Sequence, residues 1–260
     1  MITVVWFKRD LRVTDHAPLH DAARRGPVLP VYLFEPELIA QADSSPRHLG
    51  FILECLAELE ARLTALGSPL QRWQGTAVEV LQALRERLGP FRLSSHEETG
   101  NLASYARDRA VARWCREQGV EWQQWPSGGV VRRLHDRDAW SRLWMERMTP
   151  TPLAAPAALQ PPPCPIPSPL RLPPGGAPRH LAWHPDTLPD HPARQQGGRS
   201  HARQLLRHFF DQHLPDYRRG MSSPLSAGDA CSRLSPYLAF GAVSVREIVH
   251  AVWRRRTELQ

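Results

Sequence analysis

The segment Ile2–Phe7 (ITVVWF) is followed at once by the charged segment Lys8–Arg12 (KRDLR), and this junction decides the fold. An unbroken apolar run of this length is typical of a β-strand with both sheet faces covered. A second such run, Val28–Phe34 (VLPVYLF), follows the helix-like segment Ala17–Arg25. The order strand, helix, strand predicts a parallel β-sheet flanked by helices.

The same alternation continues to residue 125. We expect a helix to begin at Pro46 and to end at Gly67, because apolar residues recur between them at three-to-four spacing. The capping box Thr76-x-x-Glu79 begins another helix, and Asn101 can cap a third. Further strands are expected at Leu70–Trp73, Phe91–Ser95 and Val120–Trp125. We therefore predict an α/β fold with a five-stranded parallel, doubly wound sheet and helices on both faces.

The chain changes character at Thr149–Gly198, which holds 15 of the 26 prolines. Proline removes backbone donors and fixes φ, so we interpret this stretch as an interdomain linker, either draped over the surface or flexible. A proline-rich ligand for a recognition domain is the alternative. Beyond it the pattern is helical, with a capping box at Ser244-x-x-Glu247. We predict an α/β domain at 1–130, a linker at 131–198 and the beginning of an all-α domain at 199–260.

Composition restricts the setting. No stretch approaches the roughly 20 apolar residues that span a bilayer, so no membrane partner is expected. The start of the chain is typical of a buried strand and not of a signal peptide. The net charge of +7 fits a polyanionic partner such as nucleic acid, or reflects arginine-rich composition alone. The scattered cysteines indicate neither zinc nor a disulfide framework and favour a reducing cytoplasm; they are Cys55, Cys115, Cys164 and Cys231.

Three segments are candidates for chemistry. The charged loop after Phe7 is either a nucleotide site at the end of a strand or a salt-bridged cap of the sheet. His96-Glu97-Glu98 could bind a metal, but no second ligand cluster is apparent, so we expect a polar loop and no metal site. Cys231–Gly241 can cradle a pyrophosphate ahead of a helix, or Ser235-Pro236 in it is an ordinary helix start. Neither G-x-G-x-x-G nor G-x-x-x-x-G-K-[ST] occurs in the chain.

Two of these segments resemble a known family. VWFKRDLRVTD at Val5–Asp15 closely resembles the opening signature of DNA photolyases and cryptochromes, W-F-R-R-D-L-R-x-x-D-N. CSRLSPYLAFG at Cys231–Gly241 resembles their flavin-phosphate segment, T-S-R-L-S-P-Y-L-x-F-G, and Tyr217 matches the tyrosine upstream of it. Phe51–Leu63 and Tyr105–Arg113 resemble two helices of the family's antenna domain. The resemblance covers the whole chain in the family's order of antenna domain, linker and helical domain.

The resemblance implies an FAD in the helical domain and an antenna pigment, a folate or a deazaflavin, in the α/β domain. It implies a carbon–carbon lyase that repairs UV-induced pyrimidine dimers in DNA by light-driven electron transfer from reduced FAD. UV-damaged DNA is then the partner, and a monomer is expected. The positions that match the FAD contacts are Tyr217, Cys231, Ser232, Arg233, Leu234 and Ser235. No catalytic residue is assigned within this chain.

The sequence departs from the family pattern at several positions, and these departures leave other functions open. Cys231 replaces the usual threonine, and a thiol is a poorer donor to phosphate than a hydroxyl. His16 replaces the usual asparagine, and Ala103-Ser104 stands where folate-binding members carry Asn-Glu. Family members continue past residue 260, so we expect little or no repair from these residues alone. The alternatives are a cryptochrome-type blue-light photosensor and a truncated, non-catalytic remnant.

Overall fold

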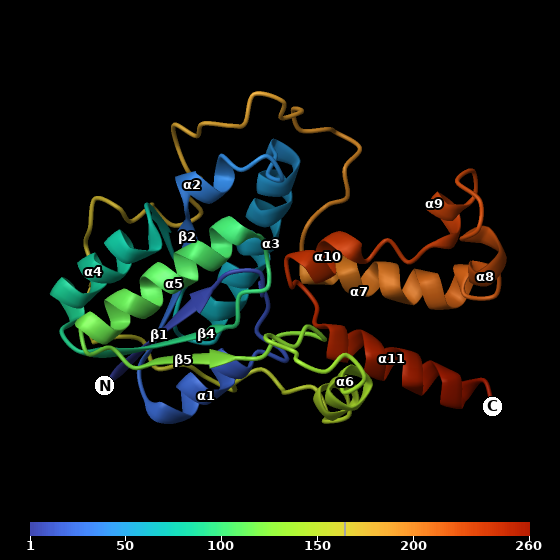
Figure 1. Cartoon of the computed structure of the whole chain (residues 1–260), viewed down its shortest axis with the longest axis horizontal. Coiled ribbons are helices and arrows are strands. Elements are labelled where there is room, and N and C mark those ends of the chain that lie inside the picture. The colour runs from blue at the N-terminus through green and yellow to red at the C-terminus, as the bar shows by residue number, and fades with distance from the viewer. Residues whose placement is uncertain (164) are drawn as a thin grey trace.

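The computed structural model describes residues 1–163 and 165–260, so Cys164 lies outside the described residues. Helices and strands alternate up to Trp125, the described residues after Met148 form a long stretch without helices or strands, and the last part from Arg199 is helical (Figure 1). The elements are β1 (Ile2–Phe7), α1 (Ala17–Arg25), β2 (Val28–Phe34), α2 (Pro36–Ile39), α3 (Pro46–Ala65), β3 (Gln71–Gln74), α4 (Ala77–Leu88), β4 (Phe91–His96), α5 (Leu102–Glu117), β5 (Trp122–Trp125), α6 (Trp140–Met148), α7 (Arg199–His208), the π-helical turn η1 (Phe209–His213), α8 (Tyr217–Gly220), α9 (Ala227–Ala230), α10 (Ser235–Ala239) and α11 (Val245–Glu258).

The sheet has five parallel strands in the order β3-β2-β1-β4-β5. This confirms the predicted α/β fold, with β3 and β5 shifted by one or two residues from the expected ranges. The chain builds outward from β1 on one side and then crosses to β4 on the other. In sheets of this kind, ligands bind beyond the carboxyl ends of the strands where the order reverses. That edge lies next to the segment that follows β1.

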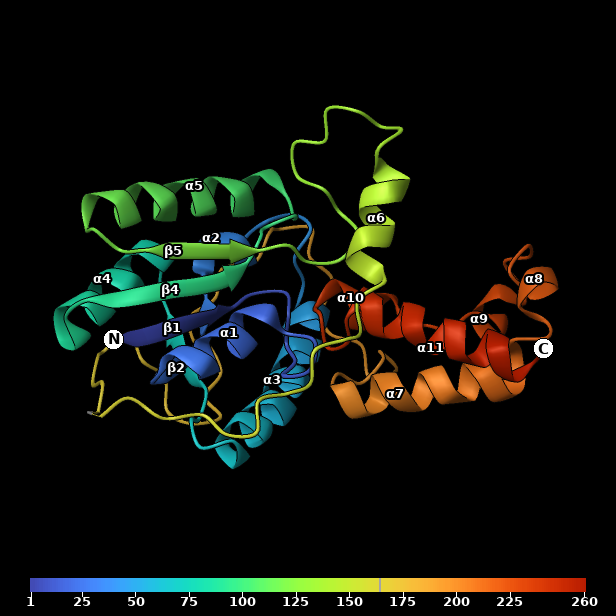
Figure 2. The same ribbon diagram turned by 90° about the horizontal axis from the view of Figure 1, so that it is seen from below.

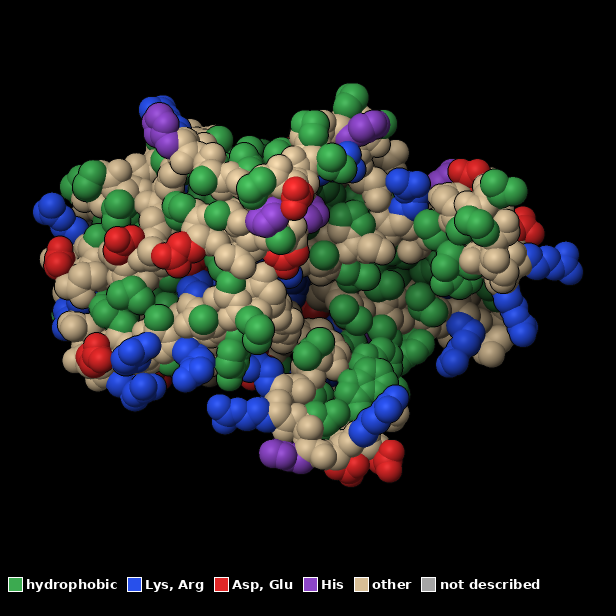
Figure 3. Space-filling view, turned by 45° about the horizontal axis from the view of Figure 1, so that its top comes forward, with side chains coloured by type: hydrophobic (Ala, Val, Ile, Leu, Met, Phe, Trp, Pro, Cys, Tyr) green, Lys and Arg blue, Asp and Glu red, His purple; other side chains and the backbone are tan. Residues whose placement is uncertain are grey.

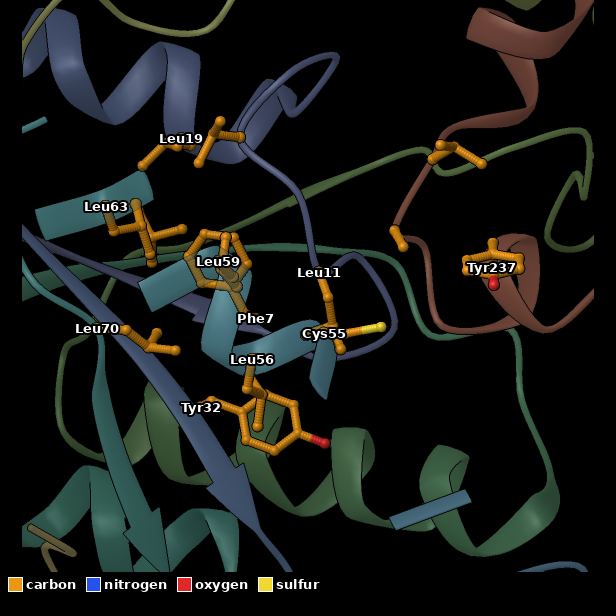
Figure 4. Close-up of a cluster of buried hydrophobic side chains, with 14 of the residues drawn as sticks. Phe7, Leu11, Leu19, Tyr32, Cys55, Leu56, Leu59, Leu63, Leu70 and Tyr237 are labelled. Atoms are coloured by element: carbon orange, nitrogen blue, oxygen red, sulfur yellow. The ribbon is translucent and has the colours of Figure 1, made fainter. Parts of the chain in front are cut away.

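Alternate residues of β1 face two different cores, which explains its unbroken apolar sequence. Val5 and Phe7 pack with residues of α1 and α3, whereas Val4 and Trp6 pack with residues of α4 and α5. Figure 2 shows the sheet between these two helical layers. The first core extends into the helical half of the chain, since Tyr237 belongs to the same cluster as Leu56 and Leu59 (Figure 4). The two halves therefore share one apolar core.

The proline-rich stretch is draped over the α/β part. Its residue Gln160 accepts a hydrogen bond from the backbone of Val28 at 2.8 Å, and Leu172 donates one to Arg72 at 2.8 Å. Arg171 pairs with Trp73, so the stretch covers the outer edge of β3, which would otherwise expose unpaired backbone groups. One helix, α6, lies within the range 131–198 that the sequence indicated as a linker.

The helical half docks on the sheet through α10 and ends in α11. The capping box predicted at Ser244 is present at the start of α11. None of the residues of α11 is buried, although the sequence places several valines and an isoleucine there, and Val252 is 46% exposed. The described residues include no helix with the length and apolar character that crossing a bilayer requires.

Candidate functional site

A cavity of about 420 Å³ opens at the carboxyl ends of β1 and β2. On the face drawn in Figure 3, the surface is hollowed between the α/β part and the helices. Its walls are rich in aromatic side chains, and its floor carries charges. The aromatic lining residues are Trp6, Phe7, Tyr32, Phe34, Trp183 and Phe240. This volume and this lining suit a planar aromatic ligand, because such sites are largely apolar with a few convergent polar groups.

The floor of the cavity is a buried network of charges. The guanidinium of Arg107 contacts Glu35 at 2.7 Å, Glu98 at 2.5 Å and Asp108 at 2.8 Å. Lys8 Nζ lies 3.0 Å from Asp108, and both Lys8 and Arg107 lie over the ring of Trp6. Burial raises the pKa of Glu35 and lowers the pKa of Lys8. Each buried charge thus has a partner, which fixes the floor of the site.

The mouth of the cavity has a cation that the protein leaves free. Arg9 is exposed, lines the cavity and makes no hydrogen bond or ion pair with any residue that the structure describes. Ser104, which stands where folate-binding relatives were expected to carry a glutamate, also lines the cavity. Trp183 reaches the same cavity from the proline-rich stretch. A ligand would therefore meet aromatic walls and one free guanidinium.

A second, polar cavity of about 270 Å³ lies beside the first and shares Lys8, Arg9 and Glu98 with it. At its edge the carboxylate of Asp10 is fully buried between two histidines. Asp10 Oδ2 lies 2.9 Å from His16 Nε2 and 2.6 Å from His96 Nδ1. Its Oδ1 accepts the backbone N–H of Lys8 at 2.6 Å. Burial opposes ionisation, but the two histidines hold the pKa of Asp10 well below its usual range.

The cluster of Asp10, His16 and His96 has donor atoms close enough together for a metal ion. Its hydrogen bonds argue against that use. His16 Nδ1 accepts the backbone N–H of Leu19 at 3.1 Å, as the N-cap of α1, so the proton of the neutral ring sits on Nε2 and points at Asp10. A metal on Nε2 would force a proton onto Nδ1 against that N–H. The donor atoms of this cluster therefore fit a hydrogen-bonded network and do not fit a metal ion.

Sequence reasoning noted His96 but found no partner for it. The signal was available in the strand order, because His96 ends β4 and Asp10 follows β1, and β1 and β4 are neighbours in the sheet. His16 was noted only as a departure from the expected asparagine. The structure shows that it takes over the capping of α1 and also binds Asp10.

The two segments that carried the family resemblance meet at the first cavity. Lys8 and Arg9 line it from the first segment, and Ser235 and Phe240 line it from the second. Leu11 donates its N–H to the carbonyl of Phe240 at 3.1 Å, so the segments are also joined through the backbone. Arg12 donates to the carbonyl of Gly241 at 3.1 Å. These contacts close one side of the cavity.

The residues expected to contact FAD are placed on different surfaces. Tyr217 is 41% exposed on α8 and packs edge-to-face against Phe209. The Cys231 thiol lies 3.8 Å from the carbonyl of Gly228, and Ser232 is half-buried beside it. Leu234 is buried in the shared core. Ser235 lines the aromatic cavity, whereas Arg233 lines a third, open cavity of about 640 Å³.

The third cavity is lined mainly by cationic, amide and aromatic side chains. Its lining residues are Gln195, Gln196, His201, Gln204, Leu205, Arg207, His208, Arg233 and Tyr237. Arg233 adopts a left-handed backbone with φ of 52°, and its carbonyl accepts a hydrogen bond from Gln195. Two guanidinium groups suit a diphosphate.

Comparison with known proteins agrees with this geometry. The family model described as DNA photolyase matches residues 3–135. A deoxyribodipyrimidine photo-lyase of Streptomyces griseus is 31% identical over 96% of this chain and 54% of its own length. Cryptochrome-2 of Arabidopsis thaliana is 27% identical over 95% of this chain and 42% of its own length. The chain spans about half the length of the curated photolyases that it matches.

Solved structures show the same fold. A cryptochrome of Synechocystis superposes with a TM-score of 0.76 at 24% identity, covering 99% of this chain and 56% of its own. A photolyase of Sulfolobus tokodaii, which was solved with two FAD molecules, superposes with a TM-score of 0.70 at 22% identity, covering 98% of this chain and 57% of its own. The family model spans half of the chain, and its match includes β1 and the charged segment whose contacts with Phe240 and Gly241 build the cavity. This chain belongs to the DNA photolyase/cryptochrome family.

Proposed function

We propose that this chain acts in the light-driven repair of UV-induced pyrimidine dimers in DNA, as the part of a photolyase that holds the antenna pigment and anchors the flavin. The observation that supports this most is the joint cavity of Lys8, Arg9, Ser235 and Phe240. A light-absorbing ligand bound in a site shared between the α/β part and the helical part would lie beside the helices that we propose to anchor the flavin.

The antenna pigment is a tricyclic aromatic ligand, for which the cavity offers aromatic walls and the free guanidinium of Arg9. Folate bound through an Asn-Glu pair is disfavoured, because Ala103-Ser104 occupies that position. A deazaflavin or a flavin fits the lining better than a folate. The buried network around Arg107 keeps the floor rigid, so that the ligand is held in one orientation.

FAD, when bound in its reduced form, supplies the electron that splits the dimer. The residues of this chain would bind it through Tyr217, Cys231, Ser232, Arg233, Leu234 and Ser235. Arg233, together with Arg207 across the third cavity, would balance the charge of the diphosphate. The net charge of +7 favours a polyanionic partner such as damaged DNA. Three free cysteines among the described residues agree with a cytoplasmic setting, and we propose a monomer.

An absorbance spectrum of the purified chain tests the proposal. We expect a blue-absorbing pigment that copurifies in near-equal molar ratio and is released on denaturation as a flavin or a deazaflavin. A dimer-containing oligonucleotide should then be repaired faster under blue light than in darkness, although weakly. A colourless chain that takes up no added flavin would contradict the proposal and favour a non-catalytic remnant.

A blue-light photosensor is the second candidate, since a plant cryptochrome matches 95% of the chain and a cryptochrome structure superposes over 99% of it. The two functions separate in the same experiment. A pigmented chain that binds a dimer-containing oligonucleotide no better than an undamaged one, and repairs none of it, would support the photosensor.

A further inference from the structure

A small cavity of about 190 Å³ lies between α3, the segment after β1 and the first half of α7, and shares Arg12 with the second cavity described above. Four of its lining residues are arginines, and Glu58 is the one acidic residue among them. The arginines are Arg12, Arg62, Arg199 and Arg203. This volume is below the range of pockets for drug-sized ligands, so a small ligand or a single group of a larger one would fill it.

Arg12 brings a buried positive charge to this cavity. Its side chain is 5% exposed and donates to the backbone carbonyls of Asp15, at 2.9 and 3.3 Å, and of Gly241, at 3.1 Å. Burial lowers the pKa of Arg12, while the nearby carboxylates of Asp10, Asp15 and Glu247 act in the opposite direction, although none of them forms a direct ion pair with it among the described residues. A guanidinium has five N–H donors, so part of its hydrogen-bonding capacity remains. Burying a charge without an ionic partner is costly unless something else compensates it.

Two further arginines, Arg62 on α3 and Arg203 on α7, line the cavity and are exposed. The carboxylate of Glu58 on α3 accepts hydrogen bonds from the backbone N–H and the hydroxyl of Ser200 at 3.0 and 2.8 Å, which fixes how α3 meets α7. Arg62 follows Glu58 by one helical turn, and Arg203 follows Ser200 by about one turn, so each points from the same face as its neighbour. Within the part of the chain that the structure describes, neither side chain makes a hydrogen bond or an ion pair.

The balance of charge favours an anion. Four of the lining residues are arginines and only Glu58 is acidic; Arg199 is paired with Glu247, and Asp10 and Asp15 act on Arg12 from outside the cavity, so the exposed Arg62 and Arg203 are the cations left without a partner among the described residues. Like charges that converge without a counter-ion repel each other. Planar guanidinium groups bind the oxygens of phosphate in forked geometry, and three of them around one cavity are typical of a phosphate site.

We propose that this cavity binds a phosphate group, held by Arg62 and Arg203 at its rim and by the charge of Arg12 at its floor. The group can belong to free inorganic phosphate or to the backbone of a nucleic acid, because both present the same oxygens. Binding there would join α3 to α7, and thus the α/β part to the helical part, beside the hydrogen bonds between Glu58 and Ser200.

Inorganic phosphate is the first probe. The melting temperature of the purified chain is measured against phosphate concentration, with potassium chloride at equal ionic strength as reference. We expect a saturable rise with phosphate alone. Arg62→Gln and Arg203→Gln should each weaken the apparent affinity by about tenfold or more, because each removes a charge-assisted hydrogen-bonding partner. Arg113→Gln, on the exposed side of α5, removes the same charge elsewhere and should leave the affinity unchanged.

The melting temperatures of the variants without phosphate show whether a loss of affinity comes from misfolding. In phosphate-free buffer, R62Q and R203Q should melt no lower than the unaltered chain, because each relieves repulsion. An undamaged single-stranded oligonucleotide then distinguishes the sources. Competition with phosphate in the unaltered chain, lost in both variants, would assign the site to nucleic-acid phosphate, and its absence would assign it to the free ion. No saturable effect of phosphate, or the same effect in R62Q, R203Q and R113Q, would overturn the proposal.

Discussion

The carboxylate of Asp15, in the segment after β1, forms an ion pair with the guanidinium of Arg246, which lies 231 residues later on α11. Arg246 Nε lies 3.0 and 3.2 Å from the two carboxylate oxygens. Ser244 also donates to Asp15, and so does the backbone N–H of Leu153 at 3.1 Å. The buried side chain of Asp15 is therefore hydrogen-bonded to both the proline-rich stretch and the last helix, and it holds them at the edge of the sheet. The orientation of the helical part depends on it.

Asp15→Asn should lower the free energy of unfolding by about 3 kcal/mol, because removal of one partner from a largely buried ion pair leaves the other uncompensated. Asparagine is the conservative choice, since Asp15 has a positive φ of 52° that asparagine tolerates. Urea denaturation of D15N, Arg246→Gln and the double variant measures the coupling. Purely additive losses in the double variant would show that the pair contributes nothing.

Gly241 allows α10 to touch the segment after β1. A Cβ at this position would lie 2.3 Å from the carbonyl oxygen of Arg9 and 2.5 Å from the Cα of Asp10, and its φ of +65° is strained for other residues. Gly241→Ala should cost about 2 kcal/mol or more and separate α10 from the cavity. Gly228→Ala is the matched control, because a Cβ there meets nothing within 4 Å. We expect equal melting temperatures for G228A and the unaltered chain; an equally stable G241A would contradict the packing.

The fold could be predicted because the apolar strands and the helix caps are visible in short segments of the sequence. Strands buried on both faces read as apolar runs, and the capping boxes at Thr76 and Ser244 fixed helix starts that the structure reproduces. The exposure of α11 was not predictable in the same way. Its apolar residues have the spacing of a buried face, and periodicity alone does not tell whether a packing partner lies within the described residues.

The site was predictable only in part, for a different reason. The resemblance drew attention to both motifs, but not to their meeting at one cavity, because that contact joins Leu11 and Phe240 across most of the chain. The partners of His96 were missed because hydrogen bonds between neighbouring strands depend on strand order, which the residues of a single strand do not encode. The FAD contacts assigned to Tyr217 and Cys231–Ser235 remain a prediction.

The free guanidinium of Arg9 and the buried guanidinium of Arg107 should respond oppositely to loss of charge. Arg9→Gln should weaken binding of an added flavin by about tenfold and leave the melting temperature unchanged, because Arg9 has no partner among the described residues. Arg107→Gln should lower stability by about 3 kcal/mol or more, because Glu35, Glu98 and Asp108 lose their common cation. Fluorescence titration with flavin and thermal melts measure the two effects. An unaltered flavin affinity in R9Q would show that Arg9 does not contact the ligand.

The histidines around Asp10 should make stability depend on pH between about 6.5 and 4. Burial lowers the pKa of His96 to about 4 and also lowers the pKa of His16. Below a pH of about 6.5 these histidines therefore bind protons in the unfolded chain but not in the folded chain, and the free energy of unfolding falls as the pH falls. Each histidine contributes a slope of up to about 1.4 kcal/mol per pH unit. Asp10 contributes in the same direction only at the acid end of this window, below about pH 5, where the unfolded carboxylate begins to bind protons that the folded one does not.

His96→Asn tests the origin of this dependence. Its side-chain amide can still donate to Asp10 Oδ2 in place of Nδ1, so the network persists without the titrating ring. Urea denaturation at pH 7, 6 and 5 should show stability falling about half as steeply in H96N as in the unaltered chain, because His16 still titrates. His180→Asn, at an exposed position, should leave the slope unchanged. An identical slope in H96N would mean that His96 is not the buried neutral base that its contacts with Asp10 indicate.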